Sequence, residues 1–361
     1  KTPAENTQFL LFLAAVIKAV DEYADLLRVS VATAGNDHRL GANEAPPAVV
    51  SMFLGDELGA IVEAIKSDTY FSGSGTVEMT MGPKVLPHFI KDNTDRNRTS
   101  PFAFTGNKFE FRMPGSSLSL SGPNTVLNTA VAEALSQFSD ILEKVPSEGL
   151  PDAVHTLLRD SFRTHERIIF NGNGYTEEWL EEAKQRELPN LKSTPDALPH
   201  MISDKNICLM TKHSVLTKEE IFARYEIALE NYVKTLHIES KTLIEMVQKD
   251  FLPSSISYAG ELAFTGAKKR QLSDSISTRT EEMLAAKLSL LNDRISGGLE
   301  QLKEDTAAAE RLEGYLEAAR YYQETILPEI EALRLLLNEA EELIPDDCLP
   351  YPTYSRLLFS V

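Results

Sequence analysis

Two short stretches hold the residues best suited to chemistry: residues 35–47 (GNDHRLGANEAPP) and residues 97–115 (NRTSPFAFTGNKFEFRMPG). In the first, Arg39 stands five residues ahead of Glu44. The second contains Arg98 and then an alternation of charged and apolar side chains. Guanidinium groups bind carboxylates and phosphates through paired hydrogen bonds, and a lone carboxylate among them suits a divalent metal or a proton transfer. The mixture therefore predicts chemistry that joins ATP to an acidic substrate.

The alternation near the end of the second stretch predicts a β-strand. Side chains two residues apart share one face of a strand, so Lys108, Glu110 and Arg112 are expected to point the same way. Phenylalanines occupy the opposite face. Taken alone, this pattern also fits an ordinary amphipathic strand with a solvated charged face, and the first stretch also fits a loop with a surface ion pair.

Local spacing and turn residues predict the elements that would hold these stretches. The expected elements up to residue 145 are a helix from the Thr2 N-cap to about residue 31, a loop over 35–47, a helix over 47–65, strands over 77–81 and 108–113, and a helix over 122–145.

After residue 145 the sequence becomes rich in Ala, Glu, Leu and Lys, as in helical bundles. The Asn-Gly-Asn-Gly run at 171–174 lacks the ending of a phosphate-binding loop and is interpreted as a helix-capping turn. Expected helices cover 151–170, 176–187 and 195–202. A capping box formed by Thr217 and Glu220 opens a long helix. The rest is expected to be divided into further long helices at Pro253, Ser296-Gly297-Gly298 and Pro328.

Composition narrows the class of protein. A chain of 361 residues can form two or three domains, and its net charge of −18 argues against nucleic acid as a partner. The apolar run over 9–20 is interrupted by Lys18 and is too short to span a bilayer, so no membrane partner is expected. The two cysteines, Cys208 and Cys348, cannot form a disulfide framework, which favours a cytoplasmic location.

Both stretches closely resemble the substrate loops of glutamine synthetase, specifically its long type III branch. Residues around Arg98 resemble the motif N-R-S-A-x-x-R-x-P, and the alternating strand resembles R-I-E-x-R-x-P. The resemblance implies that Arg39 and Arg112 bind the substrate glutamate and that Glu44, on a flap, takes a proton from ammonium. It also implies that Arg98 stabilises the transferring phosphoryl group and that Glu110 ligates Mg²⁺ or Mn²⁺.

The chain departs from the family pattern at three points. The second arginine of the first motif falls at Ala103, with Arg96 as the candidate replacement. Lys108 replaces an arginine, so it keeps the charge expected beside the nucleotide but loses the bidentate geometry. The spacing from Arg39 to Glu44 is one residue shorter than in the common bacterial type.

The resemblance implies an α+β fold in which residues 1–145 form the C-terminal portion of a synthetase catalytic domain, a β-barrel plus helices, and residues 146–361 form a mainly helical region. It is close over 1–145 and weaker to the end, including the KSTPDAL run and the PYPTYSRLLFSV tail. The implied reaction makes glutamine from glutamate, ammonium and ATP through γ-glutamyl phosphate. The implied assembly is a ring homo-oligomer, a hexamer or stacked hexamers.

Several parts of the family pattern are missing from this sequence. They are the E-x-E metal strand, the N-G-x-G-x-H segment and the N-terminal β-grasp domain, and the first residue is Lys1 rather than methionine. We therefore expect this chain to be inactive by itself. Two other interpretations remain: a sister ligase that joins glutamate to a polyamine or another amine, which need not keep Glu44, and a non-catalytic helical assembly module.

Overall fold

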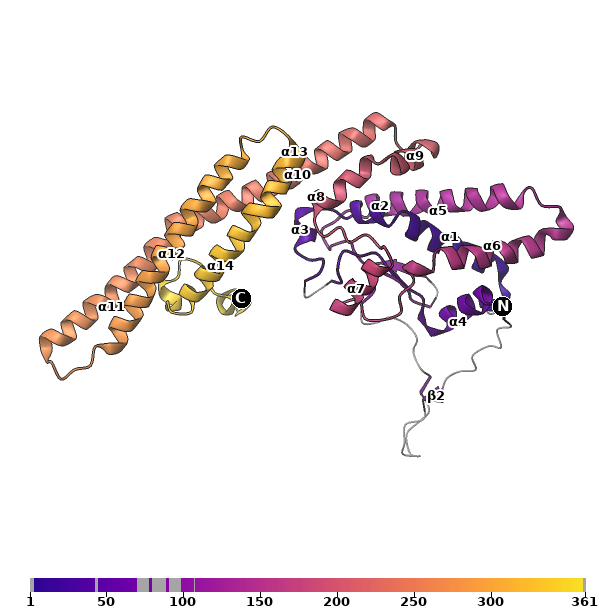
Figure 1. The fold of residues 1–361 in the computed structure, drawn as a ribbon. Coiled ribbons are helices and arrows are strands. Elements are labelled where there is room, and N and C mark those ends of the chain that lie inside the picture. Colours follow the sequence, from indigo (N-terminus) through magenta and orange to yellow (C-terminus); the bar gives the residue numbers. More distant parts are fainter. Residues whose placement is uncertain are drawn as a thin grey trace. The chain divides into compact units, whose positions relative to one another are not determined.

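The chain forms two compact units, Lys1–Ala228 and Leu229–Val361, which are described separately below (Figure 1). The predicted boundary between residues 145 and 146 falls inside the first unit, in the connection between its helices α5 and α6. The computed structural model describes residues 3–42, 45–69, 78–79, 89–90, 99–106 and 108–359.

The N-terminal helix begins later than predicted, and Asn6 supplies its cap. The Asn6 side chain accepts a hydrogen bond from the Phe9 N–H at 3.2 Å, whereas the turn before it is only a 3-10 turn. The predicted single helix is also broken at Tyr23, and the expected loop after it contains a further short helix. The elements are η1 (Pro3–Glu5), α1 (Thr7–Glu22), α2 (Ala24–Val29) and α3 (Ala34–Asp37).

A small three-stranded sheet holds the second of the two chemical stretches. Its order is β1-β4-β5, with β1 parallel to β4 and β4 antiparallel to β5. The strand predicted over 108–113 is confirmed for its centre, and two residues of the strand predicted over 77–81 are strand. The strands are β1 (Met52–Phe53), β2 (Glu78–Met79), β3 (Phe89–Ile90), β4 (Phe102–Phe104) and β5 (Phe109–Phe111), with β2 and β3 forming a separate antiparallel pair.

The helix predicted over 47–65 is wrong in its first half. Met52 and Phe53 form β1, and helix α4 (Gly55–Lys66) starts only after it. Gly55 turns the chain with a φ of +79°, a left-handed conformation that glycine adopts without strain. The apolar spacing suited a helix, but β1 is set by pairing with β4, which lies fifty residues later in the chain.

In the run at 171–174, predicted as a helix-capping turn, the Asn171 side chain caps a helix that is distant in sequence. Asn171 Oδ1 accepts from the backbone N–H groups of Leu54 at 2.9 Å and Gly55 at 3.1 Å, at the start of α4. Gly174 is required for packing, because a Cβ there would lie 2.2 Å from the carbonyl oxygen of Thr99. The turn therefore joins α4 to the segment just before β4.

Helix α1 packs against both α5 and α6 in the first unit (Figure 1). Fully buried side chains such as Ile17, Phe162 and Trp179 form the core of this unit. The elements are α5 (Ser121–Leu142), η2 (Ser147–Gly149), α6 (Leu150–Thr164), η3 (Glu166–Ile168), α7 (Glu177–Gln185), α8 (Thr194–Ala197), η4 (Leu198–Ile202) and α9 (Asp204–Lys212).

Most of the second unit is long helices, and the capping box predicted at the start of α10 (Lys218–Met246), in the first unit, is confirmed. The Thr217 N–H donates to Glu220 Oε2 at 2.8 Å, and the Glu220 N–H donates to Thr217 Oγ1 at 3.2 Å. Helix α11 packs on α12, which packs on α14. The elements are α10 (Lys218–Met246), which begins in the first unit, η5 (Val247–Phe251), α11 (Leu252–Leu272), α12 (Arg279–Ala309), α13 (Tyr315–Tyr321), η6 (Tyr322–Ile326), α14 (Leu327–Glu341), η7 (Asp346–Cys348) and α15 (Tyr354–Phe359).

The predicted helix breaks in the second unit are wrong. Pro253 and Pro328 each follow a π-helical turn, η5 and η6, and the helix continues through both. A wider turn accommodates the missing N–H and the bulk of a proline ring. The glycine pair at 297–298 lies inside α12. None of the helices in the described part of the chain is both long and apolar enough to cross a membrane.

Candidate functional site

The Arg39 side chain physically joins the two chemical stretches. Its Nη1 donates to the Met113 carbonyl oxygen at 2.7 Å and to Asn36 Oδ1 at 3.2 Å. Its Nη2 donates to the Arg112 carbonyl oxygen at 3.2 Å. The loop after α3 is therefore tied to the backbone that leaves β5, and two regions more than seventy residues apart in sequence form one site.

Asn36 fixes the same junction from inside the protein. It is buried, and its Nδ2 donates to the carbonyl oxygens of Val31 at 2.8 Å and Met113 at 3.1 Å. An amide is suited to this position because it supplies donors and an acceptor together. These hydrogen bonds fix the start of the Arg39 loop.

A buried ion pair next to Arg39 escaped the sequence analysis. Arg28 is only 1% exposed, and its Nη2 donates to Asp37 Oδ1 at 2.9 Å. Asp37 also accepts from the Thr194 backbone N–H at 2.6 Å and from the Thr194 hydroxyl at 2.9 Å. The joint connects α2, the Arg39 loop and α8, which lies in the KSTPDAL run. The available signal was a lone arginine inside the apolar sequence LLRVSV.

Burial governs the ionisation of Asp37. Removal from water raises the pKa of its carboxyl above the ordinary value, while Arg28 and the Thr194 hydrogen bonds act in the opposite direction. The Asp37 carboxylate therefore depends on these partners for its charge. Its backbone lies two residues from Arg39, so the joint positions the start of the Arg39 loop.

The charged side chains of β5 gather on one face, as predicted. Glu110 Oε2 accepts from Nε and Nη2 of Arg112, both at 3.2 Å, and Lys108 Nζ lies 3.3 Å from Glu110 Oε1. Hydrogen bonds from Arg112 and then Lys108 hold the pKa of Glu110 below its usual value. The side chain of Glu110 is 38% exposed. The site thus presents an ionised carboxylate between two cations at a solvent-facing strand.

The position of the missing family arginine is informative. Ala103 on β4 pairs directly with Glu110 on β5, and residues directly opposite each other on neighbouring strands share a face of the sheet. An arginine at position 103 would therefore lie beside Glu110. Ala103 is fully buried, so this position carries no charge where the resembled motif has a cation.

Glu110 can supply one ligand to a divalent cation, since hard cations prefer carboxylate oxygens. Within the described residues, no group of three His, Cys, Asp or Glu side chains lies close enough together to hold a metal. Both carboxylate oxygens of Glu110 already face Arg112 or Lys108, so a metal ion bound there would lie beside two positive charges. These residues therefore fit a contribution to a metal site but not a complete site.

Two of the predicted site residues are not placed. Glu44 and Arg98 lie outside the described residues, and so does Arg96, the candidate replacement for the missing arginine. Of the six predicted site residues, the structure brings Arg39, Arg112, Glu110 and Lys108 to one strand end.

A second charge cluster in the same unit was also missed from the sequence. Glu133 on α5 lies 2.7 Å from Lys212 Nζ and 2.6 Å from His213 Nε2. Although burial opposes it, hydrogen bonds from Lys212, Gln137 and His213 lower the pKa of Glu133 to about 2. This cluster joins α5 to the end of α9, and no spacing signal in the sequence pairs the two.

The fold and the site define a mainly helical α+β protein whose small sheet presents guanidinium and carboxylate groups together. The family model of the glutamine synthetase C-terminal domain matches residues 153–271. A glutamine synthetase of Butyrivibrio fibrisolvens is 45% identical over 361 residues, covering 100% of this chain and 51% of that protein. The chain belongs to the glutamine synthetase family.

Two further relatives are also similar over almost the whole chain, which covers about half the length of each. The type-3 glutamine synthetase of Dictyostelium discoideum is 38% identical over 370 residues, covering 99% of this chain and 49% of that protein. A glutamine synthetase of Bacteroides fragilis is 35% identical over 372 residues, covering 100% of the chain and 51% of the relative. The chain spans about half the length of the curated relatives it matches.

Proposed function

We propose that this chain forms part of a glutamate–ammonia ligase, which makes glutamine from glutamate, ammonium and ATP through γ-glutamyl phosphate. The observation that carries the proposal is the Arg39 junction, which sets the two chemical stretches against each other. The relatives, all called glutamine synthetases, support it. In the chemistry, phosphorylation gives the glutamate side chain a leaving group, and ammonia then displaces phosphate.

Arg39 keeps the hydrogen-bond donors that a substrate carboxylate needs. A guanidinium has five N–H donors, and three of them bond to Met113, Asn36 and Arg112. The Nε–H and one Nη2–H remain, with no acceptor among the described residues. These two donors form a bidentate contact with a carboxylate. We assign them to the glutamate substrate, with Arg112 as a second contact.

The other roles rest on the family resemblance. Arg98 would stabilise charge on the transferring phosphoryl group, because such clamps are the main catalytic device in phosphoryl transfer. Lys108 is mostly exposed and would reach the nucleotide phosphates. Glu110 would be one ligand of Mg²⁺ or Mn²⁺, which neutralises charge on the phosphates. Glu44 would take the proton from ammonium while its flap keeps water away.

The sheet and the assembly extend beyond this chain in the same proposal. Within the described residues, β5 has a strand partner on only one edge, so a further strand of a β-barrel can pair with its other edge. The relatives are about twice as long as the chain, which leaves room for the remaining metal ligands and the rest of the barrel. The complete protein would form a ring homo-oligomer, a hexamer or stacked hexamers.

The decisive experiment measures glutamine formation from ATP, glutamate and ammonium by the full-length protein and by its Glu110→Ala variant. We expect activity in the parent and a loss of at least about 100-fold in the variant. Glu261→Ala, on an exposed position of α11, is the matched control and should leave the rate unchanged. Equal rates for all three proteins would contradict the assignment of Glu110, and no glutamine from the parent would contradict the reaction.

Outcomes with other amines test the sister reaction. ATP turnover with a polyamine but not with ammonium would place the protein among the γ-glutamyl-amine ligases. The chain by itself is expected to release no phosphate from ATP in the presence of glutamate and ammonium. Turnover by this chain alone would contradict our expectation that other segments complete the site.

The second unit supports an assembly role beside catalysis. Its long helices expose large apolar side chains, including Ile238, Phe264 and Leu335. We assign this unit to contacts within the homo-oligomer. Sedimentation equilibrium of the full-length protein and its Phe264→Glu variant tests the assignment: a smaller assembly in the variant supports it, and an unchanged mass contradicts a role for this position.

A further inference from the structure

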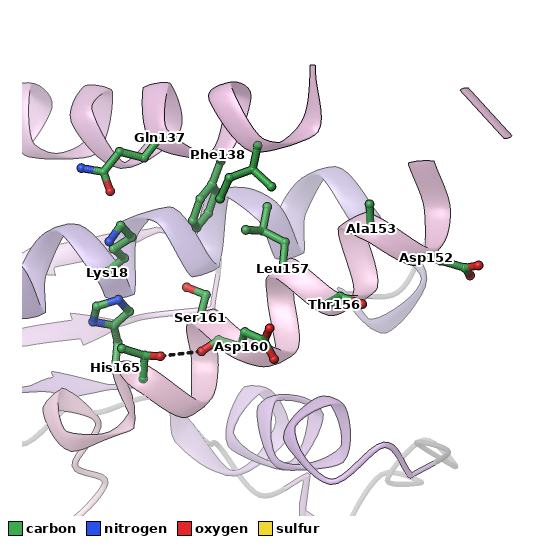
Figure 2. A pocket seen from close by; sticks show the side chains of 12 residues that line it. Lys18, Gln137, Phe138, Asp152, Ala153, Thr156, Leu157, Asp160, Ser161 and His165 are labelled. Atoms are coloured by element: carbon green, nitrogen blue, oxygen red, sulfur yellow. Dashed lines mark hydrogen bonds between the residues drawn. The ribbon is translucent and has the colours of Figure 1, made fainter. Parts of the chain in front are cut away.

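A pocket of about 560 Å³ lies between α1, α5 and α6 in the first unit, and none of its lining residues belongs to the site described above (Figure 2). Its volume falls in the range of small-molecule binding sites. Phe138 and Ile141 of α5 and Leu157 of α6 form much of its wall. Ile141 is half exposed, so the pocket is open to solvent.

One end of the pocket contains a hydroxyl group without a hydrogen bond. Ser161 is only 8% exposed, and its Oγ has no hydrogen-bond partner among the described residues. Burying a hydroxyl without a partner costs free energy, and buried polar groups in folded proteins are nearly always paired. Since Ser161 lines the pocket, a bound molecule can supply the missing partner.

His165 presents a second polar atom at the same end. It is the C-cap residue that directly follows α6, and Figure 2 shows its ring close to Ser161 and Lys18. Its Nδ1 is 2.7 Å from Asp21 Oδ2. Because the carboxylate only accepts, Nδ1 carries the proton, and Nε2 has no partner among the described residues.

The charges near this end are already paired. Lys18 forms an ion pair with Glu22, and the Asp21 carboxylate is also bound by Arg167 Nε at 2.8 Å. Asp160 lies 3.2 Å from Arg159 Nε. No uncompensated charge is therefore left at this end of the pocket to attract an ionic ligand, while two hydrogen-bonding atoms and an apolar wall remain.

We propose that this pocket binds an uncharged small molecule with an apolar body and a hydroxyl group that hydrogen-bonds to Ser161 Oγ and His165 Nε2. A hydroxyl group both donates and accepts, so it complements the serine hydroxyl and either form of the imidazole. The apolar body lies along α6 against Phe138 and Leu157, where its burial supplies most of the affinity. The proposal does not depend on the ligase function.

The test compares two probes that differ only in the hydroxyl group. Binding of 4-propylphenol and of propylbenzene to the chain is measured by titration calorimetry and by ligand-observed NMR. We expect 4-propylphenol to bind roughly tenfold more tightly, as two added hydrogen bonds predict. Failure of 4-propylphenol to bind at millimolar concentration, or equal affinities for the two probes, would overturn the proposal.

Variants locate the effect. In Ser161→Ala, the preference for the phenol should fall to about threefold or less, while thermal unfolding is unchanged or slightly higher because the lost hydroxyl made no bond. Thr164→Val is the matched control, since its hydroxyl also lines the pocket but already donates to the Asp160 carbonyl at 2.8 Å. An undiminished preference in Ser161→Ala, or an equal loss in Thr164→Val, would assign binding elsewhere.

Discussion

Glu110 on β5 and Glu133 on α5 are each bound by two basic side chains, but these side chains come from different places. Those of Glu110 stand two residues before and two residues after it on the same strand. Those of Glu133 are Lys212 and His213 at the end of α9, almost eighty residues later. The Glu110 cluster lies within one short segment of the chain, whereas the Glu133 cluster links α5 to the end of α9.

This difference determines how much each charge cluster contributes to the stability of the fold. Exposed ion pairs between neighbours on one strand contribute little to stability, so the β5 cluster adds almost nothing to the fold. Buried pairs between distant elements are costly to break, because the remaining partner is left without compensation. The charges of β5 therefore contribute little to the fold, whereas those of Glu133 hold α5 against the end of α9.

The largest effect is expected at Arg39. Its side chain ties two distant segments of the fold together and also keeps two donors for the proposed substrate contact. Arg39→Ala removes the two free donors and leaves the carbonyl oxygens of Arg112 and Met113 without their donor. We expect kcat/KM for glutamate in the full-length protein to fall about 1,000-fold, with most of the loss in KM. Arg39→Lys, which keeps the charge only, should recover a small part; an unchanged KM for glutamate in Arg39→Ala would contradict the proposed contact.

The next effect is on stability at the α5–α9 junction. Glu133→Ala leaves Lys212 and His213 without their partner, and we expect the free energy of unfolding to fall by about 3 kcal/mol. Denaturant unfolding measures it, with Glu143→Ala at the end of the same helix as the control. A loss below about 0.5 kcal/mol would show that the Glu133 cluster, like the cluster on β5, contributes little to stability.

The same carboxylate makes unfolding depend on pH. Its pKa is about 2 in the folded chain against 4.5 for an ordinary glutamate, so its contribution is fully present above pH 4.5 and disappears as the pH falls toward 2. Solvent at the edge of the cluster screens part of it, which leaves about 2 kcal/mol. Unfolding of Glu133→Gln between pH 5 and pH 2 should show a shallower slope than that of the parent; parallel curves would contradict the shifted pKa.

The smallest effect is expected at Lys108. Lys108→Arg restores the guanidinium of the family motif without changing the charge. We expect KM for ATP to fall about threefold and the unfolding midpoint to stay the same, since the side chain is mostly exposed. Steady-state kinetics of the full-length protein measures it, and a higher KM for ATP would argue against a nucleotide contact.

Much of the site could be predicted because its signals are local. The alternation of Lys108, Glu110 and Arg112 requires only the two-residue period of a strand, and the structure gathers these side chains as expected. The capping box at Thr217 and Glu220 likewise depends on four consecutive residues. Such short-range geometry is the same wherever the segment lies in the fold.

Two of the differences from prediction, at Met52 and at the start of α4, depend on a partner far away in the chain. Met52 lies in an apolar run with helical spacing, yet it forms a strand because β4 is available to pair with it. Pro253 has a local signal for a break, but the helix continues through a π turn. Capping of α4 by Asn171 has no local signal at all, since 116 residues separate Asn171 from Gly55.

The sequence by itself determined which side chains can do chemistry, the strand that carries three of them, and the net charge that argues against nucleic acid. Only the tertiary structure decided that Arg39 lies against the end of β5, that Arg28, Asp37 and Thr194 form one buried joint, and that Ser161 has an unpaired hydroxyl in a pocket. The physical reason is that periodicity and capping act over a few residues, whereas burial and hydrogen-bond pairing depend on segments that only folding brings together.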